Sequence, residues 1–181
     1  MPVKAKVENM VSAIVVDQNI DLKKFASSVK GLEYNPNRFP GVVYRIREPK
    51  LAMLIFGSGK IICTGARSKE DITTAVKKLI EKFKEGKIYI KKKPRIEVQN
   101  IVASAKIGVK VNLDMLAMEA MNTEYEPEQF PGLVFRLAEP KTVMLVFRSG
   151  KMIITGAKTP EDANKAAEKT KRAIEKIGAI I

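Results

Sequence analysis

The chain has 181 residues, 45% of them hydrophobic, which is enough apolar material for one large domain or two small, closely packed ones. It contains no histidine and a single cysteine, so the common general bases, nucleophile dyads, zinc clusters and any internal disulfide are missing. We therefore expect no enzyme activity, no cofactor and no metal. The formal net charge of +13 favours nucleic acid or another acidic partner, although lysines on solvated helix faces are the ordinary alternative.

Apolar runs in the sequence are short, reaching six residues at Leu51 to Phe56. Such runs are far below the length of a membrane span, and the N-terminal residues do not resemble a signal segment. We expect a cytoplasmic protein without a membrane partner. Cys63 lies within one of the apolar runs and is expected to be a small buried side chain.

The chain is one unit of about 90 residues used twice. When residue i is laid on residue i+91, residues 33–66 and 124–157 align without insertion and agree at 21 of 34 positions. The match continues more thinly from Lys4 and Arg95 to the ends of both copies. We therefore divide the chain into a first repeat, 1–90, and a second repeat, 91–181.

Each repeat is expected to begin with a strand, over residues 4–16 and 95–107, because apolar and polar residues alternate there. Asn9 and Asn100 occupy the same slot among valines in the two strands. Asparagine is a poor strand former. Its recurrence favours a specific hydrogen-bonding role over an accident at a strand edge.

A short helix is predicted next in each repeat. Asp21 is a good N-cap for the first copy and Asn112 for the second. We expect these helices to end at Gly31 and Asn122, since glycine and asparagine tolerate the left-handed conformation that often follows a helix.

Four short strands joined by tight turns follow the helix in each copy. The turn motifs are F-P-G, E-P-K and F-x-S-G-K, in which proline and glycine favour reversals. Each copy places one phenylalanine at the first turn and one at the last, Phe39 with Phe56 and Phe130 with Phe147. A phenylalanine beside a turn is ordinarily the edge of a core.

A long helix is predicted to end each repeat. Ser68 and Thr159 both begin a capping box, with Asp71 and Asp162 at the third helical position. The apolar stripe expected to be buried consists of Ile72, Ala75, Val76, Leu79 and Phe83 in the first copy, and Ala163, Ala166, Ala167, Ile174 and Ile177 in the second.

Both faces of the predicted sheet are apolar. Along one strand, Leu54 and Phe56 lie on one face while Met53 and Ile55 lie on the other. The helices can cover only one face. The second face is therefore expected to be a binding surface.

The doubled pattern RFPG, REPK, FGSGK, TGA and QFPG, AEPK, FRSGK, TGA, with V-x-N-x-V opening each copy, resembles the TATA-binding protein family, archaeal type. The likeness covers nearly the whole chain. It implies an α+β fold: a pseudo-symmetric saddle of two β-α-β4-α repeats that forms one curved ten-stranded antiparallel sheet with four helices on the convex face.

The resemblance also implies roles for individual residues on the open face of the sheet. Four phenylalanines match the residues that intercalate into DNA: Phe39, Phe56, Phe130 and Phe147. Residues that match base-edge contacts are Asn9, Asn100, Thr64, Thr155, Val11, Val102, Leu54, Leu145, Ile62 and Ile153. Residues that match phosphate contacts are Arg38, Arg45, Lys60, Arg136 and Lys151.

The function implied is that of a general transcription factor that binds the minor groove of TATA-box DNA, kinks and bends it by phenylalanine insertion, and nucleates the preinitiation complex. The implied partners are double-stranded TATA-box DNA, transcription factor B and, indirectly, RNA polymerase, at the nucleoid of an archaeal cell. Glu126 and Glu128 occupy the turn positions that match Asn35 and Asn37 of the first repeat. They are expected to bind transcription factor B.

Two alternatives stay open at this point. In the first alternative, the chain is a module of the same fold that binds nucleic acid on behalf of a nuclease or glycosylase. A catalytic domain fused to it would distinguish this alternative. A structural alternative makes the apolar face a homodimer interface when the protein is free of DNA.

Overall fold

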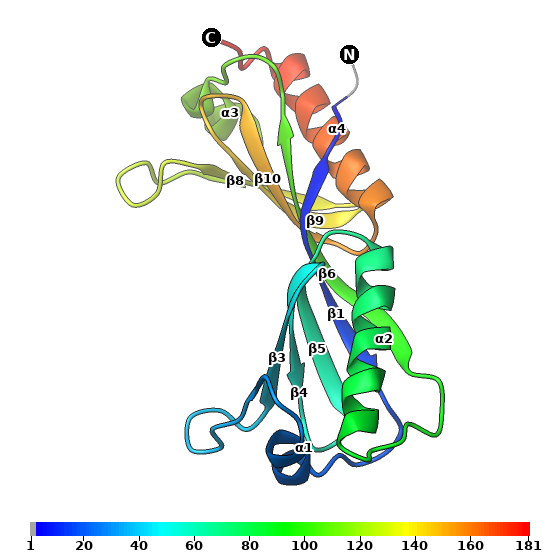
Figure 1. Ribbon diagram of the computed structural model, residues 1–181. Coiled ribbons are helices and arrows are strands. Elements are labelled where there is room, and N and C mark those ends of the chain that lie inside the picture. The colour runs from blue at the N-terminus through cyan, green and yellow to red at the C-terminus, as the bar shows by residue number, and fades with distance from the viewer. Residues whose placement is uncertain (1–2) are drawn as a thin grey trace. The chain divides into compact units, whose positions relative to one another are not determined.

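Each repeat folds in the predicted order of one strand, a short helix, four strands and a long helix. The computed structural model describes residues 3–181 (Figure 1). The elements of the first repeat are β1 (Lys6–Val15), α1 (Leu22–Ser28), β2 (Leu32–Glu33), β3 (Val42–Arg47), β4 (Lys50–Ile55), β5 (Lys60–Ala66) and α2 (Lys69–Glu85). Those of the second are β6 (Arg95–Lys106), α3 (Leu113–Glu119), β7 (Thr123–Glu124), β8 (Leu133–Ala138), β9 (Lys141–Val146), β10 (Lys151–Ala157) and α4 (Pro160–Ile177).

The strands form one ten-stranded sheet in the hydrogen-bonding order β2-β3-β4-β5-β1-β6-β10-β9-β8-β7. Within each repeat the neighbouring strands pair antiparallel. The order reads the same way outwards from β1 as from β6, as expected for two copies of one motif. The predicted antiparallel sheet with four helices is confirmed.

The chain forms two compact units that do not coincide with the first and last halves of the sequence. One unit is Asn9–Gln99, and the other joins the N-terminal segment up to Glu8 with Asn100–Ile181. In the latter, the backbone N–H of Val3 donates to Glu168 at 3.0 Å and that of Ala5 to Asn164 Oδ1 at 2.8 Å. We call them the first-repeat and second-repeat units. The division at residues 90 and 91 stays a prediction about the sequence repeat.

The predicted helix starts are confirmed, but the predicted ends of the two short helices are wrong. Asp21 and Asn112 accept hydrogen bonds from the third residue of their helices, each at 3.1 Å. Helices α1 and α3 end at Ser28 and Glu119 and are followed by extended residues. Gly31 is left-handed but lies in the turn after α1. The side-chain amide of Asn122 instead donates to the backbone carbonyl of Arg136, and the backbone carbonyl of Asn122 accepts from the Arg136 N–H. Asn122 therefore lies beside β8.

The long helices cover one face of the sheet in each unit. In the first-repeat unit α2 packs against β5 and buries Met53, Ile55, Ile61 and Cys63 completely. In the second-repeat unit α4 packs on β9 and β10 over the equivalent residues Met144, Val146, Met152 and Ile154. The predicted apolar stripes are confirmed except at Ile177, which is half-buried.

Thr170 is a buried residue of α4 that the apolar pattern did not identify. It is tolerated there because its hydroxyl donates to the Ala166 carbonyl one turn earlier, at 2.7 Å. Within residues 3–181, the helices are all too short or too polar to cross a membrane.

Candidate nucleic-acid interface

The sheet face opposite the long helices carries a half-exposed apolar surface in each unit. Along β4 and β5 the side chains alternate between fully buried and half-exposed, and β9 and β10 repeat this pattern. Leu54 lies opposite Ile62, and Leu145 opposite Ile153, so each pair points to the same face. With Val11 and Val102 from β1 and β6, these residues form what we call the apolar floor: Val11, Leu54 and Ile62 in one unit, and Val102, Leu145 and Ile153 in the other.

A polar motif interrupts the floor at the same place in both units. In the first-repeat unit, Asn9 Oδ1 accepts from the backbone N–H of Gly65 at 2.7 Å, and Asn9 Nδ2 lies 3.4 Å from Thr64 Oγ1. In the second-repeat unit, Asn100 makes the same two contacts with Gly156 and Thr155, at 2.7 and 3.4 Å. Asparagine and threonine are therefore in contact on this face in each unit.

These contacts fix what each asparagine offers to a ligand. The N–H of glycine can only donate, so the amide atom that it meets must be the oxygen. The amide nitrogen carries two hydrogens, and the threonine uses one of them through a long contact. Each asparagine thus keeps donor capacity for a ligand, and its acceptor is occupied.

A β-bulge supplies the glycine N–H. The pairing of β1 with β5 shifts between Met10 and Ser12, and that of β10 with β6 shifts between Ile154 and Ala157. Gly65 and Gly156 lie at these shifts with φ of +100° and +96°. A side chain on Gly65 would also approach Leu51 Cα to 3.1 Å. Glycine is therefore required where the backbone turns its N–H towards the asparagine.

The four predicted intercalating residues form two ring pairs, one in each unit. Phe39 and Phe56 have their centroids 5.6 Å apart at 62°, and Phe130 and Phe147 are 5.9 Å apart at 68°. These are edge-to-face contacts. The rings of Phe39, Phe56 and Phe147 are half-buried, and Phe130 is 42% exposed. None of the four belongs to the fully buried core.

Gly41 and Gly132 make room for the ring pairs. A Cβ at position 41 would lie 2.8 Å from Phe39, and one at position 132 would lie 2.6 Å from Phe130 and 3.0 Å from Phe147. Sequence reasoning assigned both glycines to the F-P-G turn alone. Their second role, as the flat surface on which the rings rest, depends on side chains from another strand end.

The predicted phosphate-binding residues are all exposed, but they differ in their surroundings. Arg45 on β3 lies 3.5 Å from Glu33, and Arg136 on β8 lies 3.7 Å from Glu124. Both glutamates belong to the short strands β2 and β7, and both were missed from the sequence. Arg38 lies in the turn before Phe39, whereas Lys60 and Lys151 begin β5 and β10.

Glu126 and Glu128 project from the turn between β7 and β8. Both side chains are exposed, and the backbone carbonyl of Glu126 accepts from the N–H groups of Gln129 and Phe130 at 3.0 and 2.9 Å. These bonds tie the turn to the ring pair. The two carboxylates are therefore presented from a structured turn.

Cys63 lies on the helix side of the sheet and does not belong to this face. It is fully buried, as predicted, and burial raises the pKa of its thiol to about 11, although the neighbouring Ser12 hydroxyl acts in the opposite direction. The part of the chain that the structure describes contains no cluster of three or more histidine, cysteine or acidic residues that could hold a metal ion.

Comparisons with known proteins agree with this arrangement. A family profile described as transcription factor TFIID, or TATA-binding protein, matches residues 4–86 and 95–177. The TATA-box-binding protein of Archaeoglobus fulgidus is 49% identical over 97% of both chains, and that of Methanocaldococcus jannaschii is 48% identical over 93% of this chain and 92% of its own. A solved structure of Methanococcus jannaschii TBP superimposes with a TM-score of 0.88 at 47% identity and covers 96% of this chain and 99% of that one.

Proposed function

The chain belongs to the TATA-binding protein family, and we propose that it is a general transcription factor that binds the minor groove of TATA-box promoter DNA. The observation that carries the proposal is the duplicated Asn-Thr-Gly motif set in the apolar floor. It offers amide and hydroxyl donors, two of each, on a face that is otherwise hydrophobic.

That chemistry suits A·T base pairs. Their minor-groove edge carries only acceptors, adenine N3 and thymine O2, whereas a G·C pair adds the protruding amino donor of guanine. Donors from Asn9, Asn100, Thr64 and Thr155 complement the acceptors. An apolar floor leaves a guanine amino group buried without a partner, which costs roughly 1–3 kcal/mol per group.

The ring pairs are proposed to kink the DNA. Proteins that bind the minor groove, TATA-binding proteins among them, insert apolar side chains between base steps at a cost of roughly a few kcal/mol per step. Burying one exposed phenylalanine returns roughly 1.5–3 kcal/mol. Because these rings are already half-buried, each returns less, so both members of a pair are needed. Contacts of the floor and the basic residues supply the remainder.

Further partners follow from the proposed role. Glu126 and Glu128 present two carboxylates that suit a basic surface, which we assign to transcription factor B, with RNA polymerase recruited through it. When DNA is absent, the same apolar floor is where a homodimer would form, in competition with DNA. Such a factor acts at the nucleoid of an archaeal cell.

The proposal is tested by competition between duplexes that differ only in the eight central base pairs, with a bend measured on the same samples by gel mobility or energy transfer. A·T pairs should bind at least about 100-fold more tightly than G·C pairs, since each wrong pair typically costs about 1–3 kcal/mol. Duplexes with I·C pairs keep the A·T pattern in the minor groove and should bind nearly as well as A·T. Equal affinity for A·T and G·C, or strong loss with I·C, would overturn the proposal.

A further inference from the structure

A cluster of lysines lies beside the apolar floor in the second-repeat unit. An open pocket of about 300 Å³ is lined by Lys4, Lys6, Ser104, Ala105, Lys106 and Lys151. All four lysines are exposed. Only Lys151 had been connected with DNA by the sequence, so three of the four cations have no assigned role.

The pocket shares a face with the floor. Ser104 lies opposite Ile153, and Lys106 lies opposite Lys151, across the pair β6 and β10. Residues directly opposite each other in an antiparallel pair point to the same side of the sheet. Since Ile153 is a floor residue, Ser104 continues the floor and leads to the lysines at the end of the same two strands.

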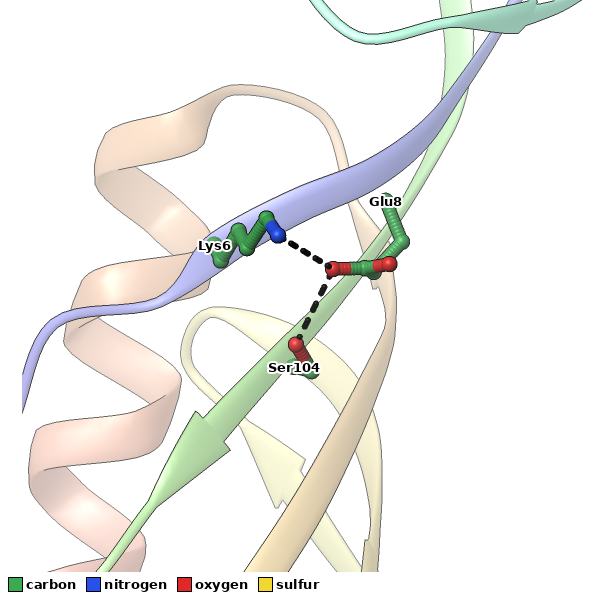
Figure 2. A network of polar contacts seen from close by, with 3 residues as sticks. All are labelled: Lys6, Glu8 and Ser104. Carbon is green, nitrogen blue, oxygen red and sulfur yellow. Dashed lines mark hydrogen bonds and ion pairs between the residues drawn. The ribbon is translucent and has the colours of Figure 1, made fainter.

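The carboxylate of Glu8 contacts two residues of this pocket. Figure 2 shows Glu8 between Lys6 and Ser104: the Ser104 hydroxyl donates to Glu8 Oε1 at 3.3 Å, and Lys6 Nζ lies 4.0 Å from the same oxygen. The Lys6 side chain is 72% exposed. An exposed ion pair at this distance is weak, so a second anion can take Lys6 at little cost.

The first-repeat unit lacks an equivalent cluster. The positions that match Lys6 and Lys106 are Glu97 and Val15, and the position that matches Ser104 is Ala13. Arg95, which matches Lys4, is held by Asp17 at 3.1 Å. In the second-repeat unit, the four pocket lysines and Glu8 have a net charge of +3. In the first-repeat unit, the matching residues Lys60, Arg95, Glu97 and Val15, taken with Asp17, have a net charge of zero.

We infer that Lys4, Lys6, Lys106 and Lys151 form a DNA backbone phosphate site that only the second-repeat unit possesses. The site rests on the proposed function, since the floor beside it is the surface proposed to bind the duplex. The DNA bases lie on the floor, and the backbone phosphates next to them enter the pocket. There they displace Glu8 from Lys6 and pair with the lysines. The second-repeat unit thereby supplies most of the salt-dependent part of the binding energy.

The test measures TATA-duplex affinity as a function of salt concentration for full-length variants. Lys4→Gln with Lys6→Gln and Lys106→Gln should reduce the slope of log K against log salt by about 2 to 3, because each phosphate contact contributes about 0.9. The matched control neutralises three exposed helix lysines, Lys23, Lys77 and Lys165, and should leave the slope within about 0.5 of the wild type.

Two variants expected to strengthen DNA binding exclude misfolding as the cause. Glu8→Gln removes the competing carboxylate and should tighten binding severalfold at low salt. Glu97→Lys with Val15→Lys builds the cluster into the first-repeat unit and should steepen the slope by about 1 to 2.

Equal slopes for the pocket and helix triple variants, or weaker binding by Glu8→Gln, would overturn the phosphate site. The proposed function fails separately, if the wild-type protein does not prefer A·T over G·C duplexes.

Discussion

The side-chain oxygen of Asn9 accepts a hydrogen bond from the backbone N–H of Gly65 at 2.7 Å, 56 residues along the chain. The second repeat makes the same bond between Asn100 and Gly156, also at 2.7 Å. The bulge glycine therefore holds each amide so that its nitrogen keeps one hydrogen to donate beyond the contact with threonine. This explains why a poor strand former recurs in the middle of two strands.

Exchanging the amide for a carboxylate separates binding from folding. Asn9→Asp with Asn100→Asp keeps an acceptor for each glycine N–H, so thermal stability should change little. DNA affinity should fall at least about 100-fold, because each variant replaces a donor with a negative charge facing acceptors. Asn9→Ala with Asn100→Ala is the control, which should lose both stability and binding, since two part-buried N–H groups lose their partners, at about 1 kcal/mol each. Normal DNA affinity in the aspartate variant would contradict the donor role.

Removing one ring of a pair should impair bending with limited loss of stability. Phe147→Ala is expected to weaken TATA binding and reduce the bend, while the free energy of unfolding falls by roughly 1–2 kcal/mol, since the ring is half-buried. Phe83→Ala is the matched control, because Phe83 is fully buried and should cost roughly 3–5 kcal/mol. The folded fraction of that control should bind and bend DNA normally. The wedge role is rejected if Phe147→Ala bends DNA like the wild type.

Charge reversal at the second-repeat turn should act on a protein partner and not on DNA. Glu126→Arg with Glu128→Arg is expected to abolish the complex with transcription factor B on preformed protein–DNA complexes, because both carboxylates are exposed and would then repel a basic surface. DNA binding should remain normal or become slightly tighter. Asn35→Arg with Asn37→Arg in the equivalent turn is the control and should retain the ternary complex. A gel-shift titration measures both, and unchanged ternary affinity in the glutamate variant would exclude the assignment.

The buried thiol makes stability depend on alkaline pH. Burial raises the pKa of Cys63 from 9.0 to about 11, so the fold favours the neutral thiol. Its contribution is fully present below about pH 9 and is lost as pH rises towards 11, where the unfolded chain has already released the proton. The stability difference between the wild type and Cys63→Val, measured by denaturant unfolding, should be constant below pH 9. Above it the difference should shift against the wild type by at most about 1.4 kcal/mol per pH unit. A difference that stays flat to pH 10.5 would show a normal thiol.

Much of this site could be predicted because its residues occur at matching positions in both repeats. A single asparagine in a strand or a single phenylalanine at a turn has ordinary explanations, but the same residue in the same slot of both copies does not. The alternation of buried and half-exposed residues in β4 and β5 follows from the period of a strand, so the face of Leu54 and Ile62 could be assigned from parity alone.

The remaining features depend on contacts that leave no local signal. Glu33 pairs with Arg45 only because a two-residue strand runs beside β3. Asn122 was expected to end a helix, yet its amide has a better partner in the Arg136 carbonyl on a neighbouring strand. The role of Gly132 beneath two rings likewise requires the strand pairing to be known.

The bonds from Val3 to Glu168 and from Ala5 to Asn164 join the first residues of the chain to its last helix. Residues 3–8 are synthesised well before α4, so this segment lacks its helix partners until α4 has followed. The first-repeat unit, Asn9–Gln99, is continuous in sequence and can close while the second repeat is still being translated. The second-repeat unit becomes complete only after α4 has been synthesised and residues 3–8 have bound to it, so its final closure comes later than that of the first-repeat unit.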